Sequence, residues 1–378
     1  MIARSGCPSQ KPEKDVQVRG PGRECEQVCW SRCSDQGAGN ITSGVRIYRT
    51  GLFKTSCVDQ DLHIKEYKSE YVGLDRAIGI CGIDLLAELE TCKGSKDPKR
   101  EHVCGRPLGL HFGKQGELYV ADAYHGLLVV TAGDKFATPV VTETQGRSLR
   151  FTNSLDVDER TGVVYFTDSS KRFQRREFMS AVISGDKTGR LMSFNLVTKE
   201  VRVVLDGLSF PNGVALSKDG TFLILAETTT CRVLRYWIQP PADSSSARNG
   251  GDIEVVAELP GFPDNIRRSP RGGFWVALHS RRSRFVAWAL SVAWIQRLIL
   301  EFGTQRLGVD LQRVSKMVGR WNGAASAVRV SGEGEVLEVL EGVGDRRMRF
   351  ISQVEERNGT LWLGSVIMPF AGVYPLAA

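Results

Sequence analysis

The sequence predicts an all-β fold, a six-bladed β-propeller, from three observations. A unit of two alternating strands around a glycine turn recurs five times after residue 104. Equivalent hydrophobic residues of the first four units lie roughly 45 to 60 residues apart, which suits four strands per unit, and the longer last interval holds an insert. A second hairpin pattern follows four of the units. Four-stranded sheets repeated around an axis are the blades of a propeller.

The inner hairpins are the clearest elements. Each alternates apolar and polar residues with period two and has a turn rich in glycine and aspartate. They span residues 105–122, 151–168, 210–227, 262–278 and 350–365. Outer hairpins are predicted at 126–141, 189–205, 231–259 and 327–342.

The sixth blade is expected from the N-terminal region, which is the least regular part of the chain. Residues 44–53 form a strand candidate, whereas 73–90 have a helical pattern, and no clear hairpin copy occurs between 40 and 100. We therefore expect a divergent or incomplete first blade, with strand exchange between the chain ends to close the ring. The chain divides into a divergent segment, 1–90, and a propeller domain, 91–378.

The interval between the fourth and fifth units holds a helical insert near 286–318. Its apolar part, 285–300, reads FVAWALSVAWIQRLIL, which is too short to span a bilayer and is interrupted by Gln296 and Arg297. This segment predicts an amphipathic helix that packs on its own domain. A helix lying on a membrane surface, as a peripheral contact through 285–300, is the less favoured alternative.

Composition limits the classes of function. The chain has 378 residues, 50 basic and 43 acidic, with a net charge of +7. It lacks the sustained lysine and arginine stripe that nucleic-acid binding requires. No long apolar run predicts a transmembrane helix, and the N-terminus lacks the apolar stretch of a secretory signal, which by itself predicts the cytosol.

The cysteines point weakly to another compartment. Cys92 and Cys104 bracket a polar loop, and this spacing could close a short disulfide, which would imply an oxidising lumen. Two glycosylation sequons, at Asn40 and Asn358, matter only if the chain enters the secretory route.

Five positions are expected to converge at one mouth of the central channel. They lie two residues before the first inward hydrophobe of each inner strand, and they are Leu108, Asn153, Asn212, Asp264 and Ser352. Asparagine and aspartate oxygens are hard ligands suited to Ca²⁺, Mg²⁺ or Mn²⁺. Local turn hydrogen bonds would explain any one of them, but three in register favour a divalent metal site.

Nucleophilic catalysis has less support. No G-x-S-x-G elbow surrounds any serine, and the five histidines do not share the register of the converging positions. His279 lies near a strand end and could reach the channel as an acid or base, although such a histidine more often only packs.

Several motifs resemble one family. CGRPLG (104–109), VVYFTDSS (163–170), FPNGVALSKDG (210–220), LPGFPDNI (259–266) and LWLGSVIMPFAGVY (361–374) are similar to the plant strictosidine synthase-like proteins, relatives of adipocyte plasma membrane-associated protein. The resemblance runs from about Cys92 to Tyr374. It implies a six-bladed propeller, a location in the endoplasmic reticulum, vacuole or extracellular space, and a disulfide between Cys92 and Cys104.

The resemblance also implies roles for single positions. Strictosidine synthase condenses an amine with an aldehyde in alkaloid biosynthesis through a glutamate, and the matching position is Ser352, which lacks the carboxylate needed for proton transfer. The wider superfamily of paraoxonases, gluconolactonases and regucalcin binds a divalent ion, and its ligands match Asn153, Asn212, Asp264 and Asn265. Leu108 stands where paraoxonase has a catalytic histidine, and a first-blade glutamate ligand has no counterpart.

The preferred hypothesis is a hydrolase of a small ester or lactone that depends on a divalent metal, expected to be Ca²⁺. Asp264 would bind the metal and activate water, and Arg106, Leu108, His279 and Ser352 would line the substrate channel. The alternatives are the strictosidine-type condensation, disfavoured by Ser352, and a non-catalytic propeller that binds a ligand or partner. A small molecule is the expected substrate in either enzymatic hypothesis.

Overall fold

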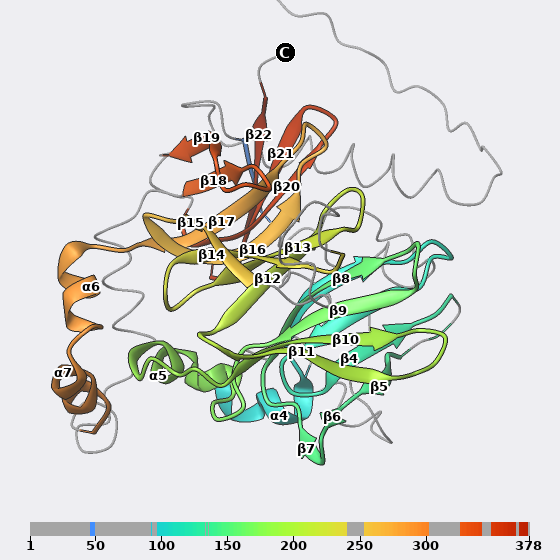
Figure 1. Cartoon of the computed structure of the whole chain (residues 1–378), viewed down its shortest axis with the longest axis horizontal. Coiled ribbons are helices and arrows are strands. Elements are labelled where there is room, and N and C mark those ends of the chain that lie inside the picture. Colours follow the sequence, from blue (N-terminus) through green and yellow to red (C-terminus); the bar gives the residue numbers. More distant parts are fainter. Residues whose placement is uncertain are drawn as a thin grey trace, which may run out of the picture.

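The computed structural model describes residues 46–49, 92, 97–132, 134, 136–239, 253–301, 326–341, 349–367 and 370–376. Within these residues, five antiparallel sheets of four strands each form successive blades (Figure 1). Neighbouring blades contact one another in chain order. The fold is therefore the all-β propeller that the repeated hairpins predict.

We name the five blades A to E in chain order. Blade A contains β2 (Pro107–Phe112), β3 (Leu118–Asp122), β4 (Gly126–Val130) and β5 (Thr138–Val141). Blade B contains β8 (Thr152–Asp158), β9 (Val163–Asp168), β10 (Gly189–Asn195) and β11 (Val201–Leu208). Blade C contains β12 (Pro211–Leu216), β13 (Phe222–Glu227), β14 (Arg232–Trp237) and β15 (Ile253–Glu258). Blade D contains β16 (Gly261–Arg268), β17 (Phe274–Arg281), β18 (Ser326–Val330) and β19 (Val336–Glu341).

Blade E joins the two ends of the described chain. Its strands β20 (Ile351–Arg357), β21 (Thr360–Ser365) and β22 (Phe370–Pro375) are completed by β1 (Arg46–Arg49), which pairs antiparallel with β22. The strand predicted at 44–53 is thus the outer strand of the last blade, as strand exchange requires. The predicted sixth blade lies outside the described residues, as does the helical pattern at 73–90.

Glycines fix the turns of the inner hairpins. In all five, the turn glycine has a left-handed backbone, with φ between 70° and 91° at Gly116, Gly162, Gly220, Gly272 and Gly359. Glycine adopts this conformation without the steric strain of a Cβ atom. The glycines that recur in the repeated sequence unit are therefore the residues that form the turns of the hairpins.

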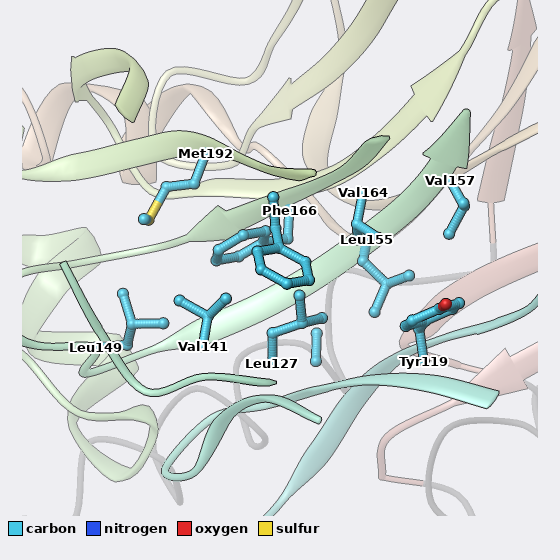
Figure 2. Close-up of a cluster of buried hydrophobic side chains, with 11 residues drawn as sticks. Tyr119, Leu127, Val141, Leu149, Leu155, Val157, Val164, Phe166 and Met192 are labelled. Carbon is cyan, nitrogen blue, oxygen red and sulfur yellow. The ribbon is translucent and has the colours of Figure 1, made fainter. Parts of the chain in front are cut away.

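The hydrophobic core consists of layers between adjacent blades. Figure 2 shows the layer between blades A and B, where Tyr119, Leu127 and Val141 face Leu155 and Phe166. Similar clusters join blade B to blade C, blade C to blade D, and blade D to blade E. Alternating strand residues supply each layer, so removing one blade would expose the apolar face of the next.

The helical insert between β17 and β18 begins with two short helices, α6 (Arg284–Ala289) and α7 (Ala293–Leu298). The single helix expected over 285–300 is therefore broken. The Ser291 hydroxyl and the Ser291 backbone N–H both donate to the Trp288 carbonyl. These bonds end α6, because a serine hydroxyl competes with the backbone N–H groups that would continue the helix. Residues 302–325 of the insert lie outside the described part.

Short elements surround the N-terminal ends of the inner strands. They are η2 (Pro98–Arg100), α4 (Glu101–Cys104), β6 (Glu143–Thr144), β7 (Arg147–Ser148), η3 (Arg175–Glu177) and α5 (Phe178–Ile183). A disulfide joins Cys92 to Cys104, with the Cα atoms 5.3 Å apart. In the described residues, no helix has the length and apolar character needed to cross a membrane.

Candidate functional site

The five positions that were expected to converge all occupy irregular points of the inner strands. The pairing register shifts across Leu108 in β2, Asn153 in β8, Asn212 in β12, Asp264 in β16 and Ser352 in β20. Such bulges re-aim side chains and are frequent beside active sites. We call the N-terminal ends of these five strands the channel mouth.

A repeated hydrogen-bond relay orients the asparagines. Asn153 Nδ2 donates to Ser169 Oγ at 2.9 Å, and Ser169 Oγ donates to the Pro211 carbonyl at 2.7 Å. One blade further, Asn212 Nδ2 donates to Thr228 Oγ1 at 3.2 Å, and Thr228 Oγ1 donates to the Pro263 carbonyl at 2.7 Å. Each relay ends on the residue directly before the next site residue, so the relays couple blade B to C and C to D.

The relay also settles which way each amide faces. A hydroxyl has one proton to donate, and Ser169 and Thr228 give theirs to a carbonyl. The hydroxyl can therefore only accept from the asparagine, which requires the NH₂ group on that side and turns Oδ1 away. Asn212 Oδ1 is buried and has no hydrogen-bond partner within the described residues.

Close backbone packing brings Asn212 beside blade D. A Cβ atom at Gly213 would lie 2.6 Å from Asn265 Cα and 2.3 Å from the Ile266 nitrogen. Only glycine permits this approach of β12 to β16. Asn212 and the adjacent pair Asp264 and Asn265 therefore lie on neighbouring strands at the point of closest contact.

Asp264 has an imidazole neighbour. Its Oδ2 lies 3.7 Å from His279 Nδ1 on the adjacent strand β17, and both side chains are less than one-fifth exposed. The His279 ring packs 5.2 Å from the ring of Phe350, centroid to centroid. The pair combines a negative charge with a group that can take up a proton, and it is partly shielded from solvent.

The remaining predicted residues have different surroundings. Ser352 is buried at the start of β20, and its Oγ lacks a hydrogen-bond partner among the described residues. Leu108 joins an apolar cluster with Phe151 and Phe210.

Arg106 is buried and forms an ion pair with Glu101 of α4, with its Nε 3.3 Å from Oε1. Of the sequons, Asn40 lies outside the described residues, and Asn358 is exposed at the turn between β20 and β21.

Aromatic residues at the mouth were missed by the sequence analysis. A phenylalanine stands two residues before the site residue in four blades, at Phe151, Phe210, Phe262 and Phe350. The rings of Phe151 and Phe210 meet edge to face at 5.2 Å. The sequence repeats phenylalanine two residues before an asparagine, aspartate or serine. This pattern could have identified the aromatic residues before the structure was known.

Charged or titratable residues stand three positions after the mouth residue in four inner strands, at His111, Asp156, Arg267 and Glu355. His111 Nδ1 is 2.9 Å from Asp156 Oδ1, which joins blade A to blade B. Arg267 of blade D donates to the Leu110 carbonyl of blade A at 3.0 Å and lies 3.9 Å from Glu355 of blade E. Burial acts to raise the pKa of Asp156, but the hydrogen bond and charge of His111 outweigh it, so its pKa is lowered. Burial raises the pKa of Glu355.

The donor set at the mouth contains one carboxylate. Among the described residues, no group of three or more His, Cys, Asp or Glu side chains could hold a metal ion. Any cation bound at the mouth would therefore depend on amide oxygens as well as on Asp264.

Known proteins of similar sequence include strictosidine synthase-like proteins. A family model described as strictosidine synthase matches residues 153–241. Strictosidine synthase-like 10 of Arabidopsis thaliana is 50% identical over 288 residues, covering 76% of this chain and 74% of the relative. Human adipocyte plasma membrane-associated protein is 37% identical over 286 residues, covering 74% and 64%. A solved gluconolactonase from Xanthomonas campestris aligns with 14% identity over 72% of each chain, at a TM-score of 0.47.

Proposed function

Because the chain belongs to the strictosidine synthase-like family of β-propeller proteins, we propose that it is a hydrolase of a small ester or lactone that depends on a divalent cation. The observation that carries this proposal is the pair of relays, which turn the amide oxygens of Asn153 and Asn212 away from their hydroxyl partners. These oxygens lie on the strands next to Asp264, the one carboxylate among the five converging positions.

The residues fit a hard cation such as Ca²⁺. Amide and carboxylate oxygens are its preferred ligands, and the buried Asn212 Oδ1 lacks a partner among the described residues. Asn153, Asn212, Asp264 and Asn265 would hold the ion. A single carboxylate gives a low ligand charge, so we expect weak binding, with a Kd on the order of 10⁻⁴ to 10⁻³ M.

A cation held by these residues would polarise the carbonyl of the ester or lactone and would offset the negative charge that develops on its oxygen. The chain itself supplies proton transfer. His279, next to Asp264, accepts a proton from water as the water oxygen bonds to the carbonyl carbon. The same imidazole returns the proton to the leaving alkoxide oxygen when the carbon–oxygen bond breaks.

The strictosidine-type condensation is disfavoured. Position 352 carries a buried serine hydroxyl, which cannot exchange a proton with an amine as a carboxylate can. We assign the nearby pair of Asp264 and His279 to hydrolysis instead.

The test is an assay of aryl esters and lactones with calcium or with a chelator. We expect turnover that needs calcium and falls about 100-fold in Asp264→Asn and His279→Gln. Asp219→Asn is the matched control, because Asp219 lies at an exposed turn of blade C and only binds local hydroxyl and N–H groups. Turnover that survives both the chelator and Asp264→Asn would contradict the proposal.

We further propose that the protein works in the secretory route. The Cys92–Cys104 disulfide supports this, because such bonds persist in oxidising compartments. Separation of the native protein by cell fractionation tests it, and recovery with cytosolic markers would contradict it.

A further inference from the structure

The insert helices carry an exposed apolar surface. On α7, Trp294 is 66% exposed and Leu298 is 47% exposed, and Trp288 on α6 is 54% exposed. Trp294, Arg297 and Leu298 follow the three- and four-residue spacing that puts side chains on one helix face. We call Trp288, Trp294, Arg297 and Leu298 the tryptophan patch. Large exposed apolar side chains that gather on one short segment are typical of an interaction surface.

Arginine outnumbers acidic residues around the patch. The segment 281–301 contains Arg281, Arg282, Arg284 and Arg297 and one acidic residue, Glu301, at its end. Arg281 is neutralised by Glu341 at 2.8 Å. Arg282 and Arg297 are both exposed. An apolar face with tryptophan and flanking arginine complements the interface of a bilayer that contains anionic lipid.

The shape of the insert favours a bilayer over a folded partner. In Figure 1, α6 and α7 stand outside the sheets at the edge of the molecule. Two helices of six residues each offer a small projecting face. A stable protein interface buries about 800 Å² on each partner, which such a face does not provide alone. A bilayer needs only shallow insertion of a few apolar side chains, with arginine in the headgroup layer.

The patch lies beside the channel mouth. Leu290, at the C-terminal end of α6, packs against the cluster that contains Leu108, Phe151 and Phe210. A protein docked through α6 and α7 would therefore hold its mouth close to the lipid surface. We propose that the tryptophan patch docks this propeller onto anionic bilayers. The corollary, which rests on the proposed hydrolase function, is that the substrates are lipophilic esters or lactones delivered from the membrane.

Vesicle flotation of the full chain tests the docking. Two vesicle types are compared, phosphatidylcholine alone and phosphatidylcholine with phosphatidylserine. We expect binding to the anionic vesicles that weakens with added salt. Trp294→Glu should reduce partitioning about tenfold or more, because burial of a large apolar side chain is lost. Arg297→Gln should reduce binding to the anionic vesicles about fivefold, from the loss of one charge near the surface.

Two controls keep the test specific. Val336→Glu changes an exposed apolar residue on β19 and should leave binding unchanged. Trp294→Phe keeps an aromatic side chain and should restore most of the binding lost in Trp294→Glu. Absence of binding to anionic vesicles would overturn the proposal, as would equal binding by the parent and Trp294→Glu.

Self-association through the patch is a further contrary outcome. A concentration-dependent dimer of the parent that Trp294→Glu abolishes, without any vesicle binding, would assign the patch to a second copy and overturn the lipid docking. Vesicle binding with no esterase or lactonase activity would leave the docking intact and remove only the corollary on substrates. The two proposals can therefore fail separately.

Discussion

The relay hydroxyl of Thr228 can be removed with little change in shape by Thr228→Val. The substitution takes the acceptor from Asn212 Nδ2 and the donor from the Pro263 carbonyl. A buried polar group left unpaired costs about 1–3 kcal/mol. Asn212 is buried, but Thr228 is only partly buried, so water can compensate in part. We expect the free energy of unfolding to fall by about 2 kcal/mol.

Urea unfolding with linear extrapolation measures this loss. Thr228→Ser keeps the hydroxyl and should lose less than about 1 kcal/mol. Thr221→Val is a matched control, because the Thr221 hydroxyl binds Asp219 at an exposed turn. We also expect calcium affinity to fall about tenfold or more in Thr228→Val, because the support that orients a metal ligand is gone. A valine variant as stable as the serine variant would refute the relay as a structural element.

Three further predictions concern burial and packing. Arg190→Met should destabilise the fold by about 3–5 kcal/mol by leaving Asp168 buried without its arginine, and Arg190→Met with Asp168→Asn should recover part of this in urea unfolding. Burial acts against ionisation of Glu356, but hydrogen bonds from an arginine, a serine and an indole outweigh burial and lower the pKa of Glu356. The ionised Glu356 therefore stabilises the fold at pH values above its ordinary pKa of 4.5, and this stabilisation is lost as the pH falls below that value. Glu356→Gln should flatten this dependence of stability on acid pH. Gly213→Ala should destabilise the fold by about 1–3 kcal/mol, because its Cβ would collide with Asn265.

The sequence was sufficient for the blades because hairpin signals are local. Alternation with period two and a turn glycine repeat in each unit, so the strands around Gly162 or Gly220 need no distant information. The pairing of β1 with β22 joins residues more than 300 positions apart, and it was anticipated only because a propeller must close its ring. The break between α6 and α7 depends on one serine bond, which a hydrophobic pattern does not report.

The sequence located the irregular points of the inner strands but not the hydrogen bonds that support them. Counting from the first inward hydrophobe identified Asn153, Asn212 and Asp264, and the structure has a bulge at each. Ser169 and Thr228 were missed because a hydroxyl sixteen residues from its asparagine carries no motif, and only the antiparallel pairing of the strands brings the two together. Arg106 was predicted to line the channel, and its ion pair with Glu101 was not anticipated, because Glu101 belongs to another element.

The central claim is that the channel mouth binds a divalent cation through Asp264 and the relay-oriented amides. Thermal unfolding of the full chain with and without millimolar calcium, for the parent and for Asp264→Ala, tests it most directly, because a ligand that binds only the folded state stabilises it by mass action. The account predicts that calcium raises the Tm of the parent and leaves that of the variant unchanged. A parent that does not respond to calcium, or a variant that responds equally, would contradict it.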